Sequence, residues 1–478
     1  MQPTDTRDPA YYHKVVDCQW ACPAHTPVPE YLRLIAQGRY ADSYMVNWVA
    51  NVFPGILGRT CDRPCEPACR RGRVEQAQTG KPEPVAICRL KRVAADFKDD
   101  VLPRMPTPVS ANGRRVACVG AGPASLTVAR DLATLGYAVT VFEGEAKAGG
   151  FMHQQIPRFR LPESVIDEET GYIFRLGVQF RAGQRIDSMK ALLSEGYDAI
   201  FVGTGAPRGR DLDLPGRREA AAHIHIGIDW LASVSFGHVS SVGERVIVLG
   251  GGNTAMDCCR SARRLGGEDV KVIVRSGFDE MKASPWEKED AQHEGIPIIN
   301  MHVPKAFVHE GGRLTGMTFE IVRAEYDASG RRSLVPTGQP DAFFACDEVL
   351  VAVGQENAFP WIERDLGIEF DRWGLPVLGQ NTFQSTLARV FFGGDAAFGP
   401  KNIITAVAQG HEAALSIDLF LDGQDVTRRP GPRANLVSQK MGIHEWSYDN
   451  DPSNDQRYKV PWAKAEQALA SIRVEVEL

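Results

Sequence analysis

The sequence predicts an α/β protein with two Rossmann-like nucleotide-binding domains, one inserted in the other, preceded by an α-helical, cysteine-rich domain. Three observations predict this arrangement. A glycine-rich turn follows the apolar segment 116–119, a second follows 246–249, and six of the ten cysteines lie in the first 88 residues. Buried-strand patterns that end in glycine recur after each turn, an echo that we expect when one such domain interrupts another.

The domain limits follow from local composition. Helical patterns at 29–37, 41–50 and 85–97 belong to the cysteine-rich region, and prolines at 102–108 mark its end. The predicted domains are 1–110 for the helical domain, 111–241 with 354–420 for the first nucleotide-binding domain, 242–353 for the second, and 421–478 for a C-terminal docking tail. The tail combines loop formers at 428–432 and 449–455 with a short helical pattern at 464–469.

Composition narrows the classes of function. The 478 residues carry a net charge of −6, which gives no basic surface for nucleic acid or anionic lipid. No apolar run reaches the roughly 18 residues of a transmembrane helix, and the polar start at 1–8 is unlike a signal peptide. We therefore predict a cytoplasmic protein with neither a nucleic-acid nor a membrane partner.

The first glycine-rich turn reads Gly120-x-Gly122-x-x-Ser125, and the strand after the following helix ends at Glu143. This strand–turn–helix–strand order is the context that a dinucleotide fingerprint requires. The first glycine permits a tight turn, the second lets the backbone approach a pyrophosphate, and the acidic residue binds a ribose hydroxyl. Ser125 stands where glycine or alanine is usual. The predicted cofactor-binding residues here are Gly120, Gly122, Pro123, Ala124 and Glu143.

Other segments complete this first site in our interpretation. A glycine pair at 149–150 and a buried strand ending in Gly-Thr-Gly at 203–205 mark close approach of backbone to a ligand. The arginines of the 156–162 segment lie either over a bound flavin or in solvent. Asp395, after two glycines, either binds a ribityl hydroxyl or caps the next helix. The predicted binding residues from these segments are Gly150, Ile156, Arg160, Thr204, Gly205, Gly394 and Asp395.

The second fingerprint begins at Gly250 and differs at the end of its second strand. That strand, 270–274, is followed by Arg275 and not by an acidic residue. An arginine attracts a 2′-phosphate where a carboxylate would repel it, so we favour NADP over NAD. Arg275 can instead be a solvated strand end. The predicted binding residues are Gly250, Gly252, Asn253, Thr254 and Arg275.

The cysteines of the first domain favour an iron–sulfur cluster. They occur as Cys18-x3-Cys22-Pro23, as Cys61-x3-Cys65-x3-Cys69, and singly at Cys88. Close cysteines in proline-bearing turns suit iron–sulfur ligation better than zinc, which prefers the Cys-x2-Cys spacing that this chain lacks. The alternatives are a structural zinc site or a helical domain with unreactive thiols.

In combination, these motifs resemble the glutamate synthase small (β) subunit family, and also the matching parts of dihydropyrimidine dehydrogenase and of NADPH:ferredoxin bifurcating enzymes. The resemblance covers about residues 15–420. The first fingerprint would then hold FAD, the second NADP (or NAD), and the N-terminal domain [4Fe–4S] clusters. The most specific segments are 61–72, 84–87, 156–162 and 250–257.

Two departures from the family pattern affect the predicted ligands. The family has a further Cys-x2-Cys pair upstream of Cys18, and this pair is absent. It also commonly has Glu or Gln at the position of Lys91, which as an ammonium cannot ligate iron. Cys88 lies one helical turn earlier and can take that place. We predict one cluster, with a second possible; the predicted ligands are Cys22, Cys61, Cys65 and Cys88, with Cys18 and Cys69 in reserve.

The resemblance implies an electron-transfer flavoprotein subunit that passes electrons between NAD(P)H, FAD and a [4Fe–4S] cluster. The predicted partner is another oxidoreductase subunit or a ferredoxin, in a hetero-oligomer: a glutamate synthase large subunit or a 2-oxoacid:ferredoxin oxidoreductase. No general acid or base is required, and no catalytic residue is assigned. The alternatives are a disulfide reductase of the thioredoxin-reductase type, which would need a Cys-x2-Cys pair at the flavin, and a non-catalytic nucleotide-sensing subunit.

Overall fold

The computed structural model describes residues 16–73, 83–428, 457, 460–473 and 475–476 of the chain. The chain divides into two compact units. The first contains 1–150, 164–205 and 359–460, and the second contains 151–163, 206–358 and 461–478. Each unit contains a parallel sheet, and the N-terminal region is helical, so the predicted fold class is confirmed. The predicted domain limits stay a prediction.

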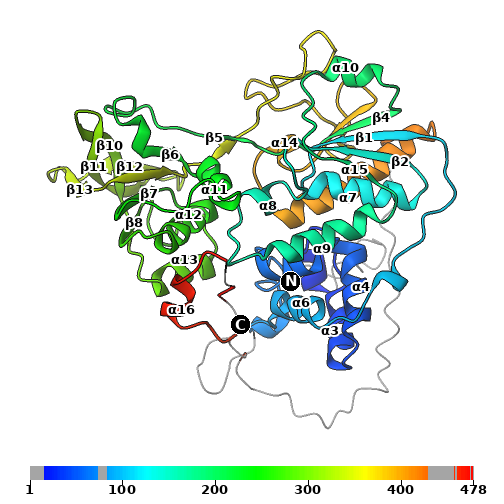
Figure 1. Cartoon of the computed structure of the whole chain (residues 1–478), viewed down its shortest axis with the longest axis horizontal. Coiled ribbons are helices and arrows are strands. Elements are labelled where there is room, and N and C mark those ends of the chain that lie inside the picture. Colours follow the sequence, from blue (N-terminus) through cyan, green and yellow to red (C-terminus); the bar gives the residue numbers. More distant parts are fainter. Residues whose placement is uncertain (1–15, 74–82, 429–456, 458–459, 474, 477–478) are drawn as a thin grey trace. The chain divides into compact units, whose positions relative to one another are not determined.

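The cysteine-rich region of the first unit is a small bundle of helices (Figure 1). Proline opens α5 and occupies the second position of α3, where its missing N–H leaves no intrahelical bond unmade. Buried aromatic side chains, among them Tyr31, Tyr44 and Trp48, fill the space between the helices. The elements are α2 (Asp17–Ala21), α3 (Val28–Ala36), α4 (Tyr40–Asn51), α5 (Pro54–Thr60), η1 (Arg70–Arg73), α6 (Ile87–Asp96) and η2 (Leu102–Arg104).

The remainder of the first unit is built on a five-stranded parallel sheet. The four strands other than β3 are almost entirely buried because helices or loops cover both faces of the sheet. Helices α7 and α15 pack against each other (Figure 1). The strand order is β16 (Val390–Phe392), β4 (Ala199–Val202), β1 (Arg115–Val119), β2 (Ala138–Phe142) and β3 (Gln179–Arg181). The helices are α7 (Pro123–Thr134), α9 (Glu163–Phe174), α10 (Met189–Ser194), α14 (Asp395–Phe398) and α15 (Ile403–Leu421).

The second unit repeats this design with a second five-stranded parallel sheet. Helices α11 and α12 pack on one face of it. The strand order is β6 (Ile224–Ile226), β14 (Glu348–Val351), β7 (Arg245–Leu249), β8 (Asp269–Ile273) and β9 (Ile298–Ile299). The other elements are α8 (Phe151–Gln154), η3 (Ala221–His223), α11 (Gly227–Ser235), α12 (Asn253–Arg264) and α13 (Pro285–His293).

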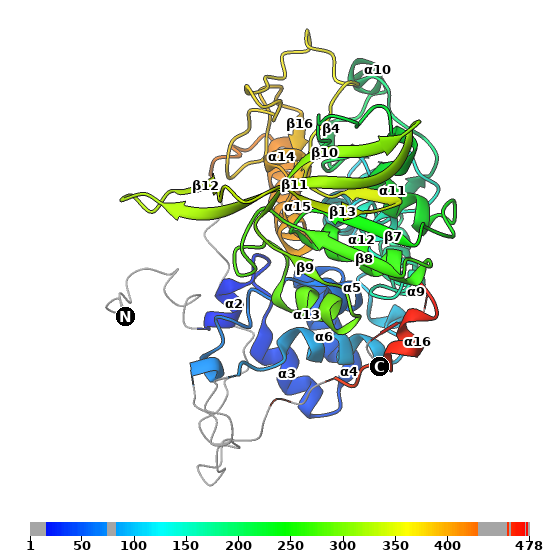
Figure 2. The same cartoon turned by 90° about the vertical axis from the view of Figure 1, so that its left-hand side faces the viewer.

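An antiparallel sheet covers the other face of this parallel sheet (Figure 2), and the two share an apolar core. A two-stranded ribbon joins β5 to β15. The additional strands are β10 (His302–Glu310), β11 (Arg313–Tyr326), β12 (Arg332–Pro336), β13 (Ala342–Ala345), β5 (Arg208–Gly209) and β15 (Gln355–Glu356).

Part of the predicted docking tail packs on the chain itself. Helix α16 (Ala465–Leu469) matches the predicted pattern. Ala463, Ala468 and Val476 form an apolar cluster with Phe159 in the second unit, and the Val476 N–H donates to the Phe159 carbonyl at 3.2 Å. The predicted loop segments 428–432 and 449–455 lie outside the described residues, apart from Arg428.

Candidate nucleotide and cluster sites

The first glycine-rich turn is packed so closely that side chains would not fit. Gly120 has φ +90°, and a Cβ there would lie 2.7 Å from the carbonyl oxygen of Gly203. Gly150 has φ +52°, and a Cβ there would lie 3.0 Å from the Cα of Gly122. The turn, the glycine pair and the strand end therefore meet at the carboxyl edge of the sheet, where open α/β sheets bind ligands.

Helix α7 begins at this turn, and the first N–H groups of a helix have no partner within the helix. Gly122 is the extended N-cap and Pro123 the first helical residue. The Glu143 carboxylate accepts hydrogen bonds from the N–H groups of Ala121 (2.8 Å) and Glu145 (3.1 Å). Burial raises the pKa of Glu143, although these bonds oppose the shift. The carboxylate thus lies beside the turn, where a ribose contact is predicted.

Residues from later strands reach the same turn. A Cβ on Gly394, which has φ +63°, would lie 3.1 Å from the Cβ of Ala124. The next residue, Asp395, accepts a hydrogen bond from the Lys401 N–H at 2.9 Å, and burial raises its pKa. The Thr204 hydroxyl is buried and has no hydrogen-bond partner among the described residues. A cradle of glycines with an unpartnered buried hydroxyl fits a bound dinucleotide.

Ser125 is explained by packing. Its side chain is fully buried, and a Cβ on Gly203 would lie 2.2 Å from its Oγ. Only a small residue fits between the helix and the strand end, and serine meets that need. The hydroxyl itself makes no hydrogen bond with a described residue.

Two residues predicted for this site belong to the second unit. Ile156 is buried there. Arg160 forms ion pairs with Asp257 of α12 and Glu287 of α13, and its side chain is 12% exposed. The interpretation of Arg160 as a solvated arginine is therefore wrong, because both its terminal nitrogens are paired. Contact of Arg160 with a flavin stays a prediction.

The second glycine-rich turn repeats the backbone geometry of the first. Gly250 has φ +141°, and a Cβ there would lie 2.2 Å from the carbonyl oxygen of Ala352. Gly252 is the extended N-cap of α12. The Asn253 amide oxygen accepts the Ser284 N–H at 2.8 Å, so this predicted ligand also holds the 276–285 loop.

The side chains after the second turn are open to a ligand. Thr254 lies in the first turn of α12 and is half-buried. Arg275 lies two residues beyond β8 with an exposed side chain, and it forms no ion pair within the described part of the chain. An unpaired guanidinium at the carboxyl edge of the sheet is suited to a phosphate.

A buried network of ion pairs lies behind this second site. Arg260 contacts Glu294 at 2.8 Å and Asp290 at 2.9 Å, and Arg264 contacts Glu294 at 2.7 Å. Both guanidinium groups also lie over the Phe159 ring, at 5.0 and 3.8 Å from its centroid. Sequence reasoning missed this network. The matched four-residue spacing of two arginines on one helix and two acids on the next was the available signal.

The cysteine sulfurs fall into two groups. Cys61 and Cys88 each affect the pKa of the other, and the Cys88 thiol donates to the carbonyl oxygens of Leu57 (3.2 Å) and Gly58 (3.3 Å). The pKa of Cys65 responds to Cys22 and Cys88. The reserve residue Cys18 interacts instead with Cys69. All ten cysteines of the chain are free, and of these six only Cys18 is more than 9% exposed. Burial raises the pKa of Cys65 to about 12.

Lys91 tests whether the first group fits a cluster. It is 5% exposed, and the cysteines acting on its charge are Cys61, Cys88, Cys22 and Cys65. Burial lowers its pKa, but these sulfurs outweigh burial and raise it. Lysine is almost never buried without a partner. A buried ammonium that faces four sulfurs fits an anionic thiolate cluster and does not fit four neutral thiols.

Glu169 connects α9 to helices α4 and α5 of the cysteine-rich region. Its carboxylate accepts the N–H groups of Gly55 (2.6 Å) and Ile56 (3.0 Å) and the Tyr44 hydroxyl (2.9 Å). Gly55 and Ile56 lie in the first turn of α5, the helix that leads to Cys61. Burial raises the pKa of Glu169 to about 7, against the effect of its hydrogen bonds. The sequence contained no signal for this contact.

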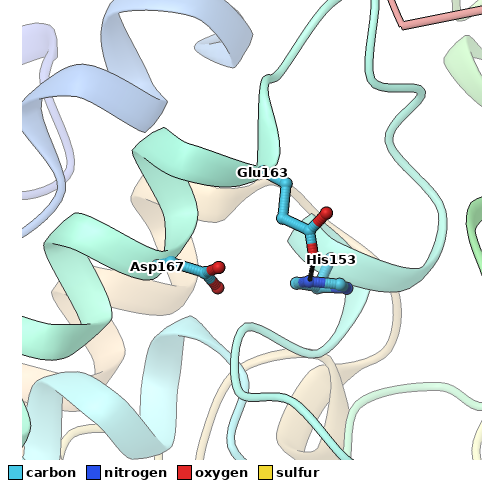
Figure 3. Close-up of side chains that lie close together, drawn as sticks. All are labelled: His153, Glu163 and Asp167. Carbon is cyan, nitrogen blue, oxygen red and sulfur yellow. Dashed lines mark hydrogen bonds and ion pairs between the residues drawn. The ribbon is translucent and has the colours of Figure 1, made fainter.

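Figure 3 draws one further acid–imidazole group. Nε2 of His153 lies 3.2 Å from Oε1 of Glu163, and both residues belong to the second unit. Asp167, the third side chain drawn, belongs to the first unit. The pair links α8 to the start of α9.

Comparison with protein families gives two matches. Residues 114–410 match the pyridine nucleotide-disulphide oxidoreductase family. Residues 11–101 match domain II of dihydropyrimidine dehydrogenase, a 4Fe–4S cluster domain. The two matches divide the chain between a nucleotide-binding part and a cluster part, as the motifs predicted.

Several relatives share about a third of the sequence. The β subunit of an NADP(+)-dependent formate dehydrogenase from Moorella thermoacetica is 34% identical, over 90% of this chain and 63% of its own length. The β subunit of an NADPH–Fe(3+) oxidoreductase from Geobacter sulfurreducens is 32% identical, over 96% of this chain and 71% of its own length. A glutamate synthase [NADPH] small chain from Halomonas elongata is 32% identical, over 85% and 88%. The chain thus spans less than two thirds of the first of these relatives.

Solved structures share the fold at low sequence identity. FprA from Mycobacterium tuberculosis, in complex with NADPH, aligns with a TM-score of 0.53 at 17% identity, over 65% of this chain and 85% of its own. Thioredoxin reductase from Lactococcus lactis aligns with a TM-score of 0.50 at 20% identity, over 65% and 99%. The likeness supports the two-domain nucleotide-binding fold.

Proposed function

The chain belongs to the pyridine nucleotide-disulphide oxidoreductase family and carries an N-terminal 4Fe–4S domain, and from this we propose that it is an electron-transfer subunit. It passes electrons between NAD(P)H, FAD and a [4Fe–4S] cluster, to or from a partner oxidoreductase. The observation that carries the proposal is the presence of two glycine cradles and a buried cysteine group on one chain. The domains that carry these three features contain most of the described residues, and they leave no separate domain among those residues for an organic substrate.

The FAD site is the first glycine-rich turn. Gly120 and Gly122 bring the backbone to the pyrophosphate, and Glu143 binds a ribose hydroxyl. Asp395, which lies after β16, binds a ribityl hydroxyl. The unpartnered Thr204 hydroxyl supports this placement. When bound, the flavin exchanges a hydride with the nicotinamide and single electrons with the cluster.

The nicotinamide nucleotide binds at the second turn. Gly250 and Gly252 admit the pyrophosphate, and the exposed Arg275 takes the 2′-phosphate of NADP. We expect Arg275→Glu to reverse the preference between NADPH and NADH. Equal rates with both nucleotides in the unaltered protein would contradict this role.

We propose Cys22, Cys61, Cys65 and Cys88 as the ligands of one cluster, because these sulfurs are neighbours of Lys91 and of one another. Cys18 and Cys69 remain in reserve for a second cluster whose other ligands lie elsewhere. Iron and sulfide assays with EPR on Cys22→Ala, Cys69→Ala and Cys88→Ala variants test the assignment. An undiminished cluster in the Cys88→Ala variant would reject it.

The partner is another oxidoreductase subunit, and the complex is a hetero-oligomer. The formate dehydrogenase, NADPH–Fe(3+) oxidoreductase and glutamate synthase relatives are all named as β subunits or small chains, which supports a subunit role. The other partner that we propose is a ferredoxin. We also propose that the protein is cytoplasmic. No helix in the described ranges has the length and apolarity needed to cross a membrane. Purification of the native complex identifies the partner.

Anaerobic titration with NADPH tests the function as a whole. We expect bleaching of the flavin absorbance followed by the EPR signal of a reduced cluster. Unbleached flavin would reject the enzyme interpretation in favour of a nucleotide-sensing subunit. The disulfide-reductase alternative is not better supported, because the chain has no Cys-x2-Cys pair and the adjacent Cys258 and Cys259 are buried inside α12, with their thiols directed at carbonyls of Gly227 and Met256.

A further inference from the structure

Lys91 is a buried cation that has no carboxylate partner among the residues that the structure describes. It lies in the middle of α6, three residues after Cys88 and on the same buried face of the helix. Its side chain is almost completely withdrawn from solvent. Within the described residues it forms no ion pair with an acid, although other basic residues of α6 do: Arg92 pairs with Asp96 at 3.0 Å.

Glu66, a buried acid near these cysteines, forms its contacts with other groups. Glu66, between Cys65 and Cys69, accepts the Cys88 N–H with Oε1 at 3.1 Å. Its Oε2 accepts from the Arg457 guanidinium at 3.0 Å. Glu66 is thus neutralised by Arg457 and does not balance the charge of Lys91. The groups left to balance the ammonium are the cysteine sulfurs.

A lone ammonium in a protein interior costs several kcal/mol, so this lysine requires an anion beside it. A four-thiolate [4Fe–4S] cluster is anionic in both of its redox states and gains a further negative charge on reduction. A fixed cation therefore stabilises the reduced state more than the oxidised one. The effect is strong because the surroundings are buried and screen charge poorly.

We propose that the Lys91 ammonium is the fixed counter-charge of the cluster held by Cys22, Cys61, Cys65 and Cys88, and that it raises the reduction potential of this cluster. The inference rests on the proposed function, since it requires that a cluster is bound. Lys91 acts as a positioning residue for charge and not as an iron ligand. It sets how readily the cluster accepts an electron.

The test compares three variants of the full chain, each assayed first for iron and sulfide. Lys91→Leu removes the charge without adding a ligand, and Lys91→Arg keeps the charge. Lys190→Leu removes an equal charge at an exposed lysine of α10, whose nearest acid is Asp365 at 3.7 Å. The readout is the midpoint potential of the cluster in an EPR-monitored redox titration, with the flavin midpoint recorded in the same experiment.

We expect the Lys91→Leu cluster to have a more negative midpoint, with Lys91→Arg and Lys190→Leu close to the unaltered protein and the flavin midpoint unchanged. A cluster that assembles in Lys91→Arg but not in Lys91→Leu would also support the proposal, because charge alone would then restore it. An unchanged midpoint in Lys91→Leu would overturn the proposal. Failure of assembly in both variants would overturn it too, because the amine itself would then be required. Absence of iron from the unaltered protein would instead reject the proposed function.

Discussion

The two glycine-rich turns have nearly the same backbone but very different surroundings. In each, a glycine with positive φ meets the carbonyl oxygen of a neighbouring strand end, at Gly203 or Ala352, and an extended glycine caps a helix of 12 residues. Behind the turns, α7 packs on α15 with one ion pair between the helices, Asp131 with His411 at 2.6 Å, whereas α12 meets α13 through a network of several buried charges. The need to bring backbone close to a ligand fixes the turn, while the rest of each helix adapts to its own neighbour.

Two arginines at corresponding positions of α7 and α12 show this difference. Arg130 and Arg260 each lie seven residues after the first residue of their helix, and each lies over an aromatic ring, at 4.7 and 5.0 Å. Arg130 donates to two backbone carbonyls in α4 and pairs with Asp131. Arg260 pairs with three carboxylates. The same position thus holds a hydrogen-bond donor to backbone in one unit and the centre of a charge network in the other.

The largest predicted effect comes from replacing each of these two arginines. We expect Arg260→Met to lower the free energy of unfolding by about 3–5 kcal/mol, because it removes the arginine that pairs with the buried Asp290 and one of the two arginines that pair with Glu294. Arg130→Met should cost only about 1–3 kcal/mol, because it mainly leaves carbonyls unsatisfied. Urea unfolding followed by fluorescence measures both. Equal losses in the two variants would show that the charges of the α12 network add nothing beyond ordinary hydrogen bonds.

Two buried carboxylates, Glu169 in the first unit and Glu294 in the second, should respond to pH in opposite directions. Glu169, which has no arginine partner in the described part of the chain, has its pKa raised by burial from 4.5 to about 7. Its ionisation therefore opposes folding, so its contribution is complete below about pH 4.5 and is lost as pH rises through 7. The total is about 3 kcal/mol, at roughly 1.4 kcal/mol for each pKa unit.

The pKa of Glu294 shifts in the opposite direction. Burial raises its pKa, but the hydrogen bonds and charges of Arg264 and Arg260 outweigh burial and lower it below 4.5. Its contribution is present above that value and is lost as pH falls. Urea unfolding from pH 4 to 8 should therefore show Glu169→Gln gaining on the unaltered protein as pH rises, and Glu294→Gln gaining as pH falls. Parallel pH profiles for the two variants would contradict the contrast.

Alanine at the first glycine of each turn should separate the two cofactors. Gly120→Ala places a Cβ 2.7 Å from a backbone oxygen, and Gly250→Ala places one at 2.2 Å. Each substitution should cost about 1–3 kcal/mol through strain at positive φ. We expect Gly120→Ala to lose FAD content, and Gly250→Ala to keep FAD but reduce slowly with NADPH. Loss of FAD from both variants would mean that the second turn does not hold the nicotinamide nucleotide.

The sequence predicted those features that depend on neighbouring residues. Glycine spacing located both turns, and cysteine spacing located the helical cluster domain, because each motif needs particular residues at fixed separations. It also predicted the short helix at 464–469. It could not predict that the residues around this helix pack on Phe159, because such a contact depends on the folded path of the chain and leaves no local pattern.

The contacts that the sequence did not reveal join residues far apart in the chain. Arg160 pairs with Asp257 across 97 positions, and Glu169 binds Gly55 across 114. Neither residue stands in a motif that names its partner. Lys91 could be recognised as unable to ligate iron, but its burial among four sulfurs required the fold. Charge and burial of single residues are properties of the packed structure.

The smallest effect tests the last position of the Gly-x-Gly-x-x pattern, where the two turns carry different small residues. Ser125 and Ala255 occupy equivalent positions, and both are fully buried. The Ser125 hydroxyl has no hydrogen-bond partner among the described residues, so it carries a desolvation cost that alanine avoids. Ser125→Ala should therefore raise the free energy of unfolding by about 1 kcal/mol and leave FAD affinity unchanged. Loss of FAD on this substitution would assign the hydroxyl a contact with the cofactor and make the first turn chemically distinct from the second.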